Sequence, residues 1–78
     1  MTYERAREIC FENKVCQFGF DIKFLDNVEE FCLKIKLNEK CIEKYFSLSY
    51  FSIISEQLFE CIVKQSIREC LSIDHNCL

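Results

Sequence analysis

Residues 18–37 carry the pattern that most constrains the fold, because apolar and polar residues alternate along two runs. The runs are FGFDIKFL and FCLKIKL, and the segment DNVE at residues 26–29 interrupts the alternation between them. Strict alternation places every second side chain on the same face of a β-strand. We therefore expect an antiparallel hairpin that buries one apolar face.

The two runs also predict a register for this hairpin. When Leu25 is placed opposite Glu30, each apolar residue of one strand meets an apolar residue of the other. The expected pairs are Phe24–Phe31, Ile22–Leu33, Phe20–Ile35 and Phe18–Leu37. On the opposite face this register pairs Asp21 with Lys34, an opposite-charge contact that stabilises a sheet. A slip of one residue would turn all the apolar side chains toward water, so the face of each residue is well specified.

Helices are predicted on both sides of the hairpin. Residues 2–14, TYERAREICFENK, have apolar residues at a three-four spacing, and Thr2 can cap the helix. Residues 55–71, SEQLFECIVKQSIRECL, form the clearest amphipathic pattern, with Ser55 or a nearby serine as a cap and Glu60 and Lys64 ordered for an i,i+4 ion pair. The apolar stripe of this second helix is Phe59, Ile62, Val63, Ile67, Cys70 and Leu71.

The segment between hairpin and last helix fits two structures. Residues 41–46, CIEKYF, alternate well enough for a strand, but they also match the spacing of a helix. We favour a third strand, because LNEK supplies a tight connection and a lone two-stranded hairpin is marginal in water. Ser47 or Ser49 would then cap a short helix that breaks near residues 52–55. The prediction is one α+β domain over residues 1–78, ordered α-β-β-β-α-α, with helices packed on one face of a three-stranded antiparallel sheet.

The chain contains seven cysteines, one glycine, no proline and no apolar leader segment. A secreted disulfide scaffold usually differs in each of these respects, so we expect a cytoplasmic protein with free cysteines that act as small buried hydrophobes. No Cys-x-x-Cys occurs, and Cys70, His75 and Cys77 in CLSIDHNC match no common zinc spacing. We expect no cofactor. A cysteine-based redox or metal-binding regulator that uses these three residues stays as an alternative.

Composition and charge argue against several classes of function. A single glycine excludes a Gly-rich phosphate loop, and a catalytic triad would depend on His75, the only histidine. We therefore expect no enzymatic activity. No apolar run is long enough to span a membrane. The net charge of −3 also disfavours direct, sequence-independent binding of nucleic acid.

The predicted order of one helix, three strands and a helix resembles that of double-stranded RNA-binding domains. That resemblance implies a lysine-rich patch at the start of the last helix, which grips phosphates. The corresponding segment here is SYFSIISEQLFE, and no basic residue follows it before Lys64. An αβββα nucleic-acid-binding domain is therefore an alternative that the charge disfavours.

In size, mildly acidic charge and predicted element order, the chain resembles small inhibitors of host defence from phages and mobile elements, anti-CRISPR proteins among them. Scarce Gly, Ala and Pro beside abundant Phe, Ile and Lys indicate an AT-rich genome, such as that of a low-GC bacterium or its phage. The resemblance implies a small non-enzymatic module that binds another protein or a ribonucleoprotein as an inhibitor or adaptor. The most specific version of this hypothesis is an inhibitor of a host nucleic-acid enzyme. A second copy of the chain is a further candidate partner.

Acidic residues near the predicted hairpin turn are the candidate partner-binding site. A compact acidic surface can occupy a basic groove that normally holds phosphates, and it gains association rate by electrostatic steering. The simpler interpretation is a solvated polar turn. The candidate residues are Asp26, Glu29 and Glu30 at the turn, with Glu39 and Glu43 further along the sheet.

Overall fold

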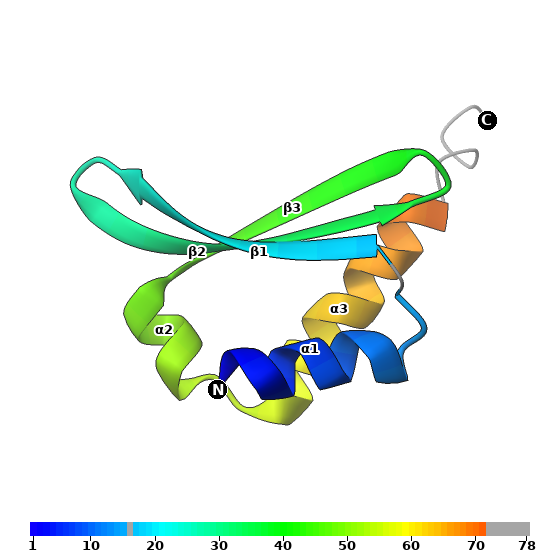
Figure 1. Ribbon diagram of the computed structural model, residues 1–78, viewed down its shortest axis with the longest axis horizontal. Helices are drawn as coiled ribbons and strands as arrows, with labels where there is room; N and C mark the ends of the chain where they lie inside the picture. Colours follow the sequence, from blue (N-terminus) through cyan, green and yellow to red (C-terminus); the bar gives the residue numbers. More distant parts are fainter. Residues whose placement is uncertain (16, 72–78) are drawn as a thin grey trace.

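The computed structural model describes residues 1–15 and 17–71, and its elements follow the predicted order. They are α1 (Tyr3–Glu12), β1 (Gln17–Leu25), β2 (Val28–Leu37), β3 (Lys40–Ser47), α2 (Leu48–Ile53) and α3 (Glu56–Leu71). The strands form an antiparallel sheet in the order β1-β2-β3, and the helices lie beneath one face of it (Figure 1). The α+β class, the element order and the third strand over residues 41–46 are confirmed.

Both connections between strands are two-residue turns with left-handed backbone. Asp26 and Asn27 have φ values of 51° and 65°, and Asn38 and Glu39 have values of 53° and 65°. Two consecutive positive φ angles define the type I′ turn, whose twist matches that of the flanking strands. Asp and Asn tolerate this region better than other residues with side chains. The turn chemistry therefore supports a tight hairpin at each position.

The predicted register of the first hairpin is wrong by two residues. Leu25 lies opposite Val28 instead of Glu30, because the turn uses only Asp26 and Asn27. The observed apolar pairs are Phe18–Ile35, Phe20–Leu33 and Ile22–Phe31. A shift of two residues preserves the face of every side chain, so the predicted inner face is correct although its pairs are not.

The correction changes two cross-strand contacts. Phe24 lies opposite Glu29 instead of Phe31, so it has no apolar partner on the neighbouring strand. Asp21 lies opposite Cys32, which means that the expected contact between Asp21 and Lys34 is also wrong.

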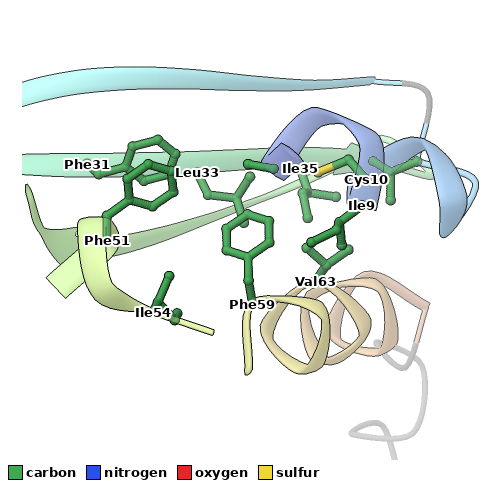
Figure 2. Packing of buried hydrophobic residues seen from close by; sticks show 11 residues of the cluster. Ile9, Cys10, Phe31, Leu33, Ile35, Phe51, Ile54, Phe59 and Val63 are labelled. Carbon is green, nitrogen blue, oxygen red and sulfur yellow. The ribbon is translucent and has the colours of Figure 1, made fainter. Parts of the chain in front are cut away.

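The central strand β2 provides the middle of the core. Its inward side chains Phe31, Leu33 and Ile35 are fully buried. Phe31 stacks on Phe51 of α2, and Leu33 and Ile35 point toward the side of the sheet where α3 contributes Phe59 and Val63 (Figure 2). The same cluster includes Ala6, Ile9, Cys10, Val15, Phe51 and Ile54. Burial of one such side chain contributes roughly 1.5–3 kcal/mol, so these residues supply most of the stabilisation available to a small domain.

Side-chain hydroxyls cap all three helices. The bonds run from the N–H of Arg5 to Thr2 Oγ1, of Tyr50 to Ser47 Oγ and of Leu58 to Ser55 Oγ, each at 3.1 Å. The predicted caps at Thr2 and Ser55 are therefore confirmed, and the middle helix uses Ser47 of the two serines considered. A cap of this kind contributes about 1 kcal/mol.

Polar contacts tie the helices to one another and to the sheet. Asn13 Nδ2 donates to Glu60 Oε2 at 3.2 Å, and the described residues contain no ion pair between Glu60 and Lys64, contrary to expectation. Arg5 Nε lies 3.0 Å from Glu56 Oε1 and so links α1 to α3. The pair between Lys44 Nζ and Glu69 Oε2, also at 3.0 Å, links β3 to α3. Such partly exposed pairs contribute little energy each, but they orient the elements.

The inner face of β2 makes a testable prediction. Leu33→Ala should lower the free energy of unfolding by about 2–5 kcal/mol, because it opens a cavity in a fully buried site. Lys36→Ser, at an exposed position of the same strand, should change it by less than about 0.5 kcal/mol. Urea denaturation followed by circular dichroism measures both values. Equal losses would contradict the assignment of the buried face.

Candidate interaction surfaces

The end of the β1–β2 hairpin extends past the helices (Figure 1), so Phe24 on the inner face of the sheet lacks cover. Leu25 and Val28 pair with each other on the outer face, which no helix covers. Phe24, Leu25 and Val28 are 67%, 46% and 48% exposed. We call this surface the hairpin tip and define it as residues 24–29. Exposed apolar side chains that gather at one place commonly mark an interaction surface. The sequence did not predict the exposure of Phe24, because the predicted register placed it opposite Phe31 instead of Glu29.

The hairpin tip brings together two of the five candidate carboxylates. Asp26 and Glu29 are exposed, and neither takes part in an ion pair within the described chain. Glu30 lies next to them but is half-buried and faces Lys23 across the strand pair. The negative charge of the tip therefore comes mainly from Asp26 and Glu29.

The remaining two candidate carboxylates lie elsewhere. Glu39 is in the turn between β2 and β3, at the other end of the ten-residue strand β2. A strand of that length separates its ends by about 30 Å, so Glu39 belongs to a different surface from Asp26. Glu43 lies on the outer face of the sheet, opposite Lys34. The structure therefore does not combine the five carboxylates into one site.

The outer face of the sheet carries a side-chain cluster that spans all three strands. The Tyr45 hydroxyl donates a hydrogen bond to Glu43 Oε1 at 2.5 Å, and Lys23 Nζ lies 5.7 Å from the centre of the Tyr45 ring. Cys32 is opposite Tyr45 and is fully buried, although no helix covers this face. Its burial raises the pKa of the Cys32 thiol.

The pKa shifts in this cluster favour a structural role. The hydrogen bond to Glu43 raises the pKa of Tyr45, and the same bond lowers the pKa of Glu43. Cys32 therefore stays a thiol and Tyr45 stays a phenol at neutral pH, and neither is an activated nucleophile. The sequence offered no signal for this cluster, because its members meet only through the strand register.

The five cysteines that the structure describes divide into two groups. Cys10, Cys32 and Cys70 are buried, as expected for small hydrophobes, whereas Cys41 and Cys61 are exposed, and for these two the expectation is wrong. All five are free thiols. Burial raises the pKa of Cys10 to about 11 and also raises the pKa of Cys70. The buried thiols are consequently the less reactive ones.

The alternative redox or metal site has one described member. Cys70 is buried near the end of α3, and His75 and Cys77 lie outside the described residues. Within residues 1–15 and 17–71, no group of three or more His, Cys, Asp or Glu side chains could hold a metal ion.

The first turn of α3 carries Glu56, which pairs with Arg5. A double-stranded RNA-binding domain would place its lysines in this region. The local charge therefore continues to disfavour that alternative. None of the helices in the described chain is both long and apolar enough to cross a bilayer.

A second surface lies along the edge of the sheet, where α1 runs beneath β1. Two adjoining hollows separate these elements, and Arg7 and Phe20 line both. The other lining residues are Tyr3, Asp21 and Ile22 in the first hollow and Phe11, Phe18 and Gly19 in the second. The exposed ring of Phe11 packs edge-on against Phe18, with ring centres 5.2 Å apart. The edge of β1 is therefore bordered by aromatic side chains.

Comparison with known proteins identifies no relative, because no family model, curated protein or solved structure matches the chain.

The two groups of cysteines predict different reactivities. In the native protein, Cys41 and Cys61 should be alkylated by iodoacetamide faster than Cys10 and Cys70, because the first two are exposed and the pKa values of the buried pair are raised. Peptide mapping by mass spectrometry after timed quenching measures each rate, and denatured protein serves as the control. Alkylation of native Cys10 as fast as that of Cys61 would contradict the packing of α1.

Proposed function

We propose that this chain is a small non-enzymatic module that binds another protein through its hairpin tip. The observation that supports the proposal is the combination of exposed Phe24, Leu25 and Val28 with the unpaired carboxylates of Asp26 and Glu29. Protein interfaces commonly combine an apolar centre with a polar rim. The turn also holds these side chains on a rigid backbone, which reduces the entropy lost on binding.

The charge of the hairpin tip indicates the chemistry of its partner. A basic surface with an apolar depression would pair with both the carboxylates and the exposed side chains, and opposite charges would accelerate association. A groove that normally binds phosphates has this character. The sharpest form of the proposal is therefore an inhibitor or adaptor from a phage, a mobile element or a low-GC bacterium. It would act in the cytoplasm on a nucleic-acid enzyme or ribonucleoprotein of the host.

The ionisable groups of the described chain support a binding role more than a catalytic one. The pKa values of Cys10, Cys32, Cys70 and Tyr45 are all raised, which moves these thiols and this phenol away from activation at neutral pH. General acid–base and nucleophilic catalysis need groups shifted toward the working pH. We therefore propose that the protein acts by occupying a surface.

The hairpin tip can be tested by removing its charge. The double variant Asp26→Asn/Glu29→Gln should still fold, because both residues are exposed and Asn tolerates the left-handed backbone of residue 26. We expect its capture of a partner from a low-GC bacterial lysate to fall several-fold, and the remaining capture to depend less on salt between about 50 and 300 mM. Mass spectrometry identifies and quantifies the captured protein.

The matched control is Glu4→Gln/Glu39→Gln, which removes the same charge at two exposed positions outside the hairpin tip. This control should bind as the wild type does. Equal capture by the wild type and the tip variant at both salt concentrations would exclude the carboxylates of the tip as the interface.

A further inference from the structure

Strand β1 has a free edge. It is the outer strand of the sheet, and the Ile22 N–H donates to its neighbour Asp21 Oδ1 at 2.9 Å instead of to another strand. Ile22 therefore directs its backbone N–H away from β2. Because ladder hydrogen bonds alternate along an antiparallel pair, Phe20 and Phe24 present their backbone groups to the same edge. Such an edge is a template for pairing with another strand.

We propose that this edge pairs with the same edge of a second copy of the chain, in an antiparallel register with Ile22 opposite Ile22 at a two-fold axis. The two three-stranded sheets then form one continuous six-stranded sheet. A two-fold interface of this kind uses the same patch on both subunits, so that patch must complement itself. The residues of β1 complement the same residues of the second copy on both faces of the sheet.

On the inner face, the register places Phe20 of each copy opposite Phe24 of the other. Within its own sheet Phe24 faces Glu29 and is 67% exposed, so it lacks an apolar neighbour across the strands. In the dimer it gains an aromatic partner beside the hollows lined by Arg7 and Phe20. Ile22, which is 39% exposed, gains its own symmetry mate.

On the outer face, the register places Asp21 of each copy opposite Lys23 of the other. Opposite charges directly across two strands stabilise the pairing, and the two-fold axis creates this contact twice. Asp21 would exchange its bond to the Ile22 N–H for this ion pair, which frees that N–H for the new ladder. The charge pattern of β1 is therefore complementary to itself when the strand is reversed about Ile22.

Gly19 supports the same register independently of the charged and aromatic pairs. It is the only glycine of the chain, its φ is not positive, and a Cβ atom added to it would meet no heavy atom within 4 Å. The fold of a single copy therefore does not require glycine here. In the proposed register Gly19 lies opposite Leu25 of the second copy, whose side chain is 46% exposed. A hollow that adjoins Gly19 and includes Gln17 and Lys36 leaves room for that side chain.

The neighbouring registers lack this complementarity. Sliding the copies by two residues centres the axis on Asp21 or on Lys23, and each choice places like charges directly opposite each other. Sliding by an odd number of positions sets the apolar face of one copy beside the polar face of the other. The register centred on Ile22 is thus favoured by charge, by the aromatic pair and by the glycine.

A charge exchange tests the proposal in the full chain. Wild-type protein should show a monomer–dimer equilibrium by sedimentation between about 10 μM and 1 mM. Asp21→Lys and Lys23→Asp should each raise the dimer dissociation constant by about tenfold or more, because each variant creates two like-charge pairs. The double variant Asp21→Lys/Lys23→Asp should recover to within about threefold of the wild type, because it restores both contacts with reversed sign.

Two matched variants control for nonspecific effects. Lys64→Glu reverses the charge of an exposed residue on α3, away from the edge of β1, and should leave the dissociation constant unchanged. Phe24→Ser should abolish the dimer, whereas Ile53→Ser, at a residue that is 79% exposed at the end of α2, should not. Circular dichroism melting curves confirm that each variant is folded.

Hydrogen exchange distinguishes edge pairing from other forms of association. The amides of Phe20, Ile22 and Phe24 should become protected as the concentration rises, while those of Asp21 and Lys23, which face β2, should stay unchanged. A monomer up to about 1 mM, a dimer insensitive to both charge variants, or a dimer without protection at the edge would each overturn the proposal. None of these results would contradict the proposed function of the hairpin tip, which the charge-removal variant tests separately.

Discussion

The burial of Phe31 on the central strand is the contact on which the rest of the structure depends. The centre of its ring lies 3.9 Å from the ring centre of Phe51 in α2. Its ring centre is also 5.2–5.9 Å from those of Tyr3, Phe20 and Phe46. These four rings come from α1, β1, β3 and α2, so one side chain connects four elements. A chain of 78 residues has little apolar surface to bury, and a shared aromatic cluster uses that surface efficiently.

The helical layer of this small domain leaves part of the sheet uncovered. The three helices gather beneath the core of the sheet, and the β1–β2 hairpin continues beyond them (Figure 1). Its apolar alternation continues as well, so Phe24 belongs to the buried face by pattern but is exposed in the structure. The exposure of Phe24 therefore follows from a sheet that is longer than the helical layer below it.

The two proposed contacts share Phe24 and Leu25 and otherwise use different chemistry. The edge of β1 offers backbone hydrogen bonds and a self-complementary pattern, whereas the turn offers the carboxylates of Asp26 and Glu29. In an antiparallel dimer the two turns lie on opposite sides of the axis. Such a dimer would cover Phe24 and Leu25 but leave the carboxylates of Asp26 and Glu29 accessible at two turns. A partner with two basic sites would bind these two acidic turns with increased avidity.

The pattern of residues 41–46 fits both a strand and a helix, so only the fold decided for the third strand. The sequence by itself determined the hairpin, the helices on both sides of it, the face of each hairpin residue and the helix caps at Thr2 and Ser55. These are local properties, because strand alternation and capping depend on neighbours within a few residues. The pairing between strands was decided only in the folded chain. A shift of two residues leaves the alternation unchanged, and the backbone of Asp26 and Asn27 selected the observed pairs. Tertiary structure also decided that Phe24, Cys41 and Cys61 are exposed and that Glu39 lies far from Asp26, because exposure and proximity depend on where the helices cover the sheet.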